Sequence, residues 1–155
     1  MRFTLRIPFL ARDTQPPSMT ERFFAAQNEA RTYGGITGLA AYWWNERAAR
    51  AAQARADDMV ARDYFAHKTP DGTSGYVEEL AKQGVTTFTW AGENLAANNY
   101  PASEAVERSI ATLMNSPTHR ANILDVEFES CGIGYALRPN GIHLFATIFL
   151  AGVGP

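Results

Sequence analysis

The chain has 155 residues, of which 46% are hydrophobic and 19% charged, a composition typical of one compact globular domain. Its formal net charge is −2 and its acids and bases are interspersed, so neither nucleic acid nor an anionic membrane is expected as a partner. No stretch approaches the ~18 consecutive apolar residues of a membrane span. Cys131 is the only cysteine, which excludes an internal disulfide, and we expect it to be a small buried apolar residue.

Residues 1–18 are expected to form an N-terminal extension and linker, and residues 19–155 the main domain. Apolar and polar side chains alternate over residues 1–12, which favours a strand. Arg6 and Pro8 interrupt the apolar run that a signal peptide needs, so no clear signal peptide is recognised. Pro16 and Pro17 then end any regular element.

Four helical segments are expected next. The first begins at Thr20, as its N-cap, and ends before Gly34. The second covers residues 46–62, and its many alanines would allow a neighbouring element to approach closely. Its wetter face is expected to carry four residues, namely Arg47, Arg50, Arg55 and Asp57. The third helix covers residues 74–83, and the fourth begins near residues 101–103.

Strands are expected mainly late in the chain. Residues 86–90 favour a strand that leads into a Gly92-Glu93-Asn94 segment. Residues 131–138 and 142–150 favour two strands joined by a turn at Asn140-Gly141, a strong hairpin signal. This order predicts an α+β fold in which helices cover both faces of a small antiparallel sheet.

Two of the three histidines stand in polar segments with a glutamate between them. Glu93 lies 26 residues after His67, and His119 another 26 residues after Glu93. Two imidazoles and a carboxylate can bind a divalent metal or move protons. Ser116 and Pro117 suit the start of a short helix with His119 in its first turn, where the helix dipole disfavours the imidazolium form. A neutral imidazole is the form that binds a metal.

Each of these residues also has an ordinary structural interpretation. His67 could bond carbonyls at a helix end, His119 could cap a loop, and Glu93 and Asn94 could bond backbone groups. His143 is expected on the solvated face of the last strand. Asp71 and Glu78 are possible further acids, although Glu78 also suits a solvated helix face. Spacing alone therefore gives weak support for a metal, since no HExxH, CxxC, P-loop or GxSxG motif is present.

Taken together and in order, these segments resemble the CAP superfamily (SCP-like; cysteine-rich secretory, venom-allergen and pathogenesis-related proteins). The resemblance runs from about Phe23 to Phe149, and the lack of cysteine pairs is similar to the bacterial branch. The segments that carry it are 27–31 (QNEAR), 64–67 (YFAH), 70–72 (PDG), 92–96 (GENLA), 114–124 (MNSPTHRANIL) and 132–135 (GIGY).

The resemblance implies a three-layer α-β-α sandwich with a central antiparallel sheet and a cleft lined by two histidines and two acids. His67, Glu93 and His119 match three of these positions, and Asp71 or Glu78 is the candidate for the second acid. In the family the histidines often hold zinc or another divalent ion. Members are typically secreted, so an extracellular or cell-envelope location is implied. Their ligands are lipids, glycans or other proteins.

Three functions remain open on the sequence. The first is a binding domain in which His67 and His119 hold a metal, with Glu93 and Asn94 in the same cleft. The second is a metal-dependent hydrolase or protease that uses that cleft, with zinc-bound water or Glu93 as the base. Ser116 is a poor nucleophile in this hypothesis if its hydroxyl already caps a helix. The third is an interaction surface in which the site is a vestige.

Overall fold

The computed structural model describes residues 15–35 and 38–154, so the strand expected within residues 1–12 lies outside the described residues. In chain order this part contains α1 (Met19–Tyr33), β1 (Trp43–Trp44), α2 (Glu46–Ala61), α3 (Gly75–Lys82), β2 (Trp90–Asn98), α4 (Ala105–Asn115), α5 (Pro117–Leu124), β3 (Ser130–Leu137) and β4 (His143–Ala151). The predicted α+β class is confirmed.

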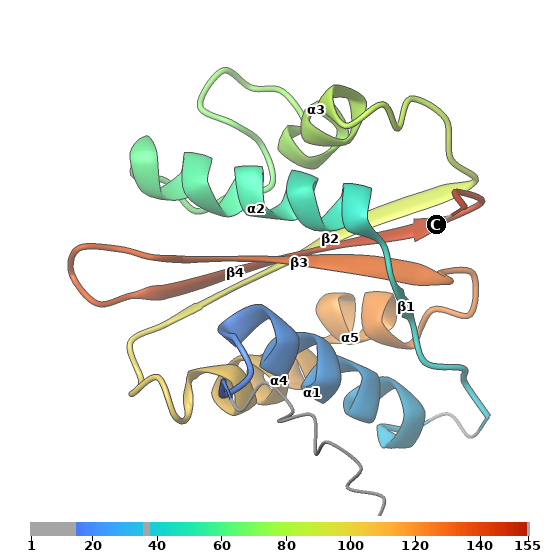
Figure 1. The fold of residues 1–155 in the computed structure, drawn as a ribbon, viewed down its shortest axis with the longest axis horizontal. Helices are drawn as coiled ribbons and strands as arrows, with labels where there is room; N and C mark the ends of the chain where they lie inside the picture. Colours follow the sequence, from blue (N-terminus) through green and yellow to red (C-terminus); the bar gives the residue numbers. More distant parts are fainter. Residues whose placement is uncertain (1–14, 36–37, 155) are drawn as a thin grey trace, which may run out of the picture.

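The fold has three layers, with the sheet between two layers of helices (Figure 1). Helices α2 and α3 cover one face of the sheet, and α1, α4 and α5 cover the other. The strand order is β1-β3-β4-β2, which makes β2 and β1 the two edges. Strands β3, β4 and β2 are antiparallel as expected, but β1 runs parallel to β3, so the sheet is mixed. This short strand leads directly into α2.

Helix α2 lies very close to β3, as its alanines predicted. A Cβ added to Gly132 would come within 2.0 Å of the Ala49 nitrogen, and one added to Gly134 within 2.1 Å of the Ala52 oxygen. Glycines on the strand and alanines on the helix therefore let the two backbones meet without side chains between them.

Helix α1 is tied to the neighbouring helix α5 by Arg31, which is only 3% exposed. Its guanidinium donates to the carbonyls of Ile123 and Asp125 at the end of α5, and lies over the Tyr42 ring. Because these acceptors lie on separate segments, Arg31 fixes α5 against α1.

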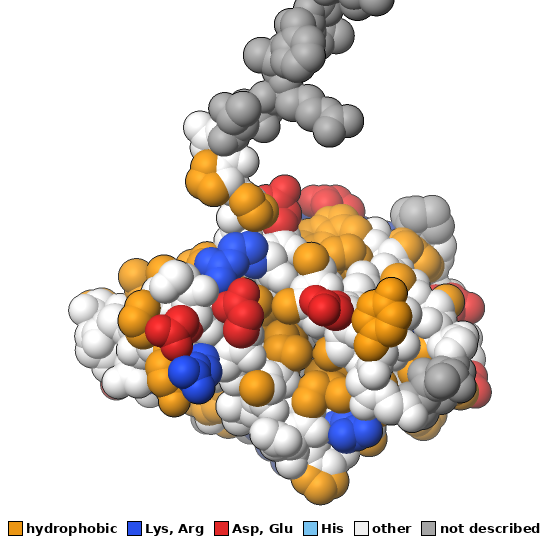
Figure 2. All heavy atoms as spheres, turned by 90° about the horizontal axis from the view of Figure 1, so that it is seen from below, with side chains coloured by type: hydrophobic (Ala, Val, Ile, Leu, Met, Phe, Trp, Pro, Cys, Tyr) orange, Lys and Arg blue, Asp and Glu red, His pale blue; other side chains and the backbone are white. Residues whose placement is uncertain are grey.

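The lower helical layer carries exposed hydrophobic side chains among scattered charges (Figure 2). One shallow hollow of about 400 Å³ lies between α1 and α4 and is lined in part by Tyr33 and Ile110. Among the described residues, no helix is both long and apolar enough to cross a membrane.

Three sequence predictions about local structure were wrong. The N-cap of α1 is Ser18 rather than Thr20, because Ser18 and Glu21 form a reciprocal capping box. Strand β2 begins at Trp90 and contains Glu93 and Asn94, which were expected after a strand. His143 is 6% exposed rather than solvated, since β4 is covered on both faces, and its Nδ1 lies 2.8 Å from the Tyr135 hydroxyl.

Candidate functional site

The structure brings His67, Glu93, Asn94 and His119 together around the outer edge of β2. Glu93 and Asn94 are neighbours on this strand, so their side chains point to opposite faces of the sheet. Glu93 faces α2 and the loop that carries His67, whereas Asn94 faces α5, which carries His119. The two histidines therefore approach the same edge from opposite helical layers.

Glu93 is the centre of a buried set of polar contacts. Its side chain is 1% exposed and accepts from Arg55 Nε at 2.9 Å through Oε1. Its second oxygen, Oε2, lies 2.8 Å from His67 Nδ1. A carboxylate in this position holds the proton on Nδ1 of His67, so the Nε2 lone pair remains free. The imidazole itself is 55% exposed and points toward solvent from a fixed orientation.

Arg55 is the residue of the candidate site that sequence reasoning missed. It was expected on the wetter face of α2 but is 1% exposed. Its guanidinium also donates to the Tyr64 hydroxyl at 2.6 Å and to the Ala66 carbonyl at 2.7 Å, so it fixes the loop that leads to His67. Burial acts to lower the pKa of Arg55, but the hydrogen bonds and charge of Glu93 and Tyr64 outweigh it and raise that pKa.

Helical spacing could have revealed Arg55. Buried residues of α2 recur at positions 48, 52, 55–56 and 59, which is one continuous stripe at intervals of three and four. An arginine within such a stripe must find a buried acid and several acceptors. Gly75 at the start of α3 provides the room, because a Cβ there would come within 2.5 Å of the Arg55 guanidinium.

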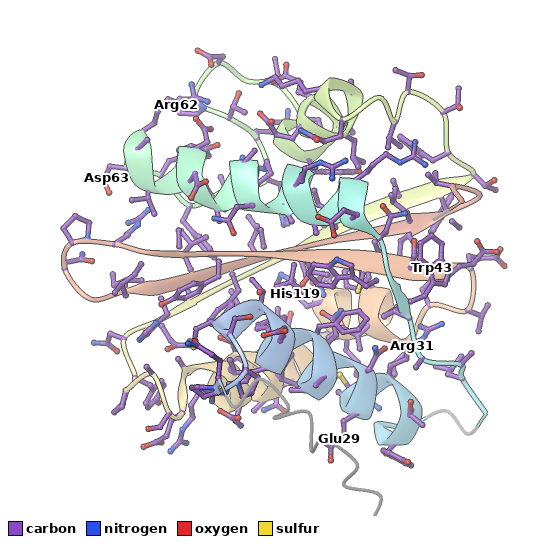
Figure 3. All side chains as sticks on the ribbon, viewed as in Figure 1. Glu29, Arg31, Trp43, Arg62, Asp63 and His119 are labelled. Carbon is purple, nitrogen blue, oxygen red and sulfur yellow. The ribbon has the colours of Figure 1, made fainter. Side chains whose placement is uncertain are left out.

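His119 lies in the first turn of α5, below the sheet (Figure 3). Its Nδ1 is 2.8 Å from the Ser116 hydroxyl, which makes no hydrogen bond to the helix backbone and so is not the side-chain cap that was expected. Burial, with a smaller effect from His67, lowers the pKa of His119. A lowered pKa favours the neutral form of the imidazole.

Asn94 joins β2 to α5. Its side-chain nitrogen donates to the His119 carbonyl at 3.0 Å, and its oxygen accepts from Asn122 at 2.8 Å. Asn94 is 1% exposed, so it holds the backbone of His119 rather than presenting a group to solvent.

Neither of the two further acids that were considered forms a hydrogen bond or ion pair with His67 or His119. Asp71 forms an ion pair with Arg62 at 2.6 Å. Arg62 also pairs with Asp58, which accepts from the Tyr64 hydroxyl, and that hydroxyl in turn accepts from Arg55. Glu78 is exposed on α3. Among residues 15–35 and 38–154, no group of three or more His, Cys, Asp or Glu side chains is arranged to hold a metal ion.

A groove of about 340 Å³ adjoins His119. Phe65 from the His67 loop lines one side of it. The rest of the lining comes from four residues of β2 (Leu95, Ala96, Ala97 and Asn98), three of α4 (Ser109, Thr112 and Leu113), and Ser116 between α4 and α5. A larger hollow of about 800 Å³ lies beside Trp43 and Trp44 at the opposite edge of the sheet, where neither histidine reaches. The smaller groove is therefore the candidate ligand site, because it is the one that His119 lines.

Comparison with known proteins decides the family. The family model described as "CAP: Cysteine-rich secretory protein family" matches residues 24–150. The chain belongs to the CAP family. Two curated Bacillus subtilis relatives are similar over 63% of the chain: the uncharacterized protein YkwD, 34% identical, and the uncharacterized membrane protein YlbC, 31% identical. The aligned regions cover only 36% and 26% of these longer proteins.

Solved structures confirm the CAP fold. An extracellular Bacillus anthracis protein containing an SCP domain matches 86% of this chain and 40% of its own, with a TM-score of 0.69 and 26% identity. An outer surface protein of Borrelia burgdorferi matches 83% of this chain and 88% of its own, with a TM-score of 0.68 and 17% identity. Both neighbours are thus extracellular or surface proteins, and the second likeness shows the fold alone.

Proposed function

We propose that this CAP domain works outside the cell, where it binds a lipid, glycan or protein ligand in a cleft that holds a divalent metal ion such as zinc. The side chains of His67 and His119 would coordinate the metal ion, each through Nε2. The single observation that carries the proposal is the Arg55–Glu93–His67 chain, because it fixes both the orientation and the tautomer of a solvent-facing imidazole.

The donor set fits an open metal site. Zinc accepts imidazole nitrogens, and a site with open positions leaves room for water or for an atom of the ligand. The lowered pKa of His119 favours the neutral ring that a metal ligand requires. Glu93 would act behind His67 rather than on the metal, because both of its oxygens already accept hydrogen bonds.

The alternative is a metal-dependent hydrolase or protease that uses the same cleft. Glu93 is poorly placed as its general base, since it is buried and both oxygens are occupied. Activation would then depend on the bound metal alone. We therefore place ligand binding first and hydrolysis second.

Calorimetric titration with Zn²⁺ tests the metal site in untagged protein. His67→Ala and His119→Ala should each weaken binding by at least tenfold, about what outer-shell and ligand losses produce in other sites. The matched control is His143→Gln, which removes the third histidine outside the cleft and should leave Zn²⁺ affinity unchanged. Equal affinity in all four proteins would refute the site. Turnover of peptide or ester libraries that disappears in His119→Ala would instead favour the hydrolase.

A further inference from the structure

Strand β2 has hydrogen-bonding groups to offer along its outer edge. In an antiparallel ladder, alternate residues turn both N–H and C=O toward one neighbour, and the residues between them turn both groups the other way. Among the residues that the structure describes, β2 pairs only with β4, so half of its backbone groups face outward.

The hydrogen bonds of the next strands identify these residues. Arg138 N donates to the Ile142 carbonyl, and Tyr135 directs both its backbone groups to Gln53 rather than to β4. Even-numbered residues of β4 therefore bond to β3, and odd-numbered ones to β2.

The register between β4 and β2 then shows which residues of β2 direct their N–H and C=O groups toward β4 and which direct them outward. His143 and Phe145 lie opposite Asn98 and Ala96, so the even-numbered residues of β2 bond inward. Glu93, Leu95 and Ala97 face outward, and the contact from Asn122 Nδ2 to the Glu93 carbonyl, at 3.5 Å, agrees with this direction. Outside the strand ladders, no hydrogen bond within residues 15–35 and 38–154 engages the N–H or C=O of Leu95 or Ala97.

The groove beside His119 runs along this edge. Consecutive strand residues point to opposite faces, so a cavity that touches all of residues 95–98 must follow the backbone edge. Its walls come from both layers, with Phe65 on one side and α4 with Ser116 and His119 on the other. The lining contains no Asp, Glu, Lys or Arg.

We propose that the occupant of this groove is an extended, uncharged peptide segment that adds to β2 as a fifth strand. The proposal rests on the ligand-binding role argued above and names the ligand class. The N–H and C=O of Leu95 and Ala97 supply up to four hydrogen bonds to such a segment. Four residues of β2 span about 13 Å, which matches a peptide of about four residues.

A peptide fits these groups better than an acyl chain does. A hydrocarbon would cover the outward N–H and C=O groups without pairing them, and a buried unpaired polar group is costly. A charged segment would meet no opposite charge in the lining. The uncharged polar and apolar walls instead suit the alternating side chains of a short strand.

The test uses the full chain and a blocked peptide of alternating threonine and valine, titrated by NMR with amide hydrogen exchange as the direct readout. In the free protein, the amides of Leu95 and Ala97 should exchange fast and those of Ala96 and Asn98 slowly. The peptide should protect the first pair. Ala97→Pro removes one outward N–H without breaking the β4 ladder and should weaken binding roughly tenfold or more.

Two further variants keep the test decisive. Ala91→Pro is the matched control, because it removes an outward N–H of the same strand outside the groove, and it should bind the peptide like the natural chain. Thr112→Trp fills the groove from an exposed position of α4 and should abolish binding while the fold is kept. Equal affinity of Ala97→Pro, Ala91→Pro and the natural chain overturns the proposal.

The remaining outcomes separate this proposal from the metal site. Peptide protection of Leu95 and Ala97 in a His67→Ala/His119→Ala double variant supports the added strand even if Zn²⁺ binding fails. Zn²⁺ binding without any protection of these amides overturns the added strand and leaves the metal site standing. Protection that rises with protein concentration in the absence of peptide, together with dimers in sedimentation, overturns the peptide in favour of a second copy of the chain.

Discussion

Replacement of Glu93 by glutamine probes the buried ion pair on which the His67 orientation depends. Arg55 and Glu93 are each 1% exposed in their side chains, and Glu93 accepts from both Arg55 and His67. Glutamine keeps the shape but has one oxygen and no charge, so either Arg55 or His67 loses its acceptor and the guanidinium stays buried without a counter-charge.

The expected cost is large because removal of one partner leaves an uncompensated buried charge, which costs about 3–5 kcal/mol. The guanidinium keeps its hydrogen bonds to Tyr64 and Ala66, which places the loss near the lower limit. In a domain of this size, a loss of about 3 kcal/mol in the free energy of unfolding lowers Tm by roughly 6–12 °C.

Urea unfolding of metal-free protein at pH 7.5 measures the effect. The matched control is Glu104→Gln, which breaks the exposed Arg108–Glu104 pair, whose side chains are 54% and 49% exposed. That change should cost less than about 0.5 kcal/mol. A double variant, Arg55→Met with Glu93→Leu, should recover most of the loss, since paired replacement by apolar groups is often neutral. Equal losses in Glu93→Gln and Glu104→Gln would refute the reasoning.

Three other predictions follow from the packing and the charges. Gly134→Ala should destabilise the domain by roughly 1–3 kcal/mol in the same urea assay, because its Cβ would lie 2.1 Å from the α2 backbone. Gly154→Ala is its control and should leave the free energy of unfolding unchanged, because open space surrounds that position. Arg31→Ala should cost about 3–5 kcal/mol in that assay, since it strands several buried carbonyls, and an effect below about 1 kcal/mol would contradict its bridging role. The hydrogen bond from Arg62 lowers the pKa of Asp58, so the stability that Asp58 contributes is complete above about pH 4 and is lost as the pH falls through its lowered folded-state value. Asp58→Asn should therefore flatten the acid limb of stability between pH 5 and pH 2.5, and an unchanged acid limb in this variant would contradict the reasoning.

Much of the fold followed from local patterns. The alanines of α2 predicted the close approach of a neighbouring element, and the Asn140-Gly141 turn predicted a hairpin; both are confirmed. The prediction for β2 was wrong because glycine, glutamate and asparagine are poor strand formers. Here the pairing with β4 and the partners of Glu93 and Asn94 override that propensity.

The sequence could name candidate residues for the site but not the contacts between them. Sequence order cannot show that His67 and His119 reach one sheet edge from opposite layers, because this depends on which strand ends at the edge. Arg55 was assigned to solvent because arginine is rarely buried. Only its place in the buried stripe of α2 indicates otherwise, and its partner is 38 residues away.

The protonation state of the two imidazoles tests the central claim most directly. Long-range nitrogen–proton NMR at pH 7.5 should show the proton on Nδ1 of both His67 and His119, with both Nε2 resonances shifting when Zn²⁺ is added. A proton on Nε2 of either ring, or a shift of only one Nε2 resonance, would contradict a metal held jointly across the edge of β2.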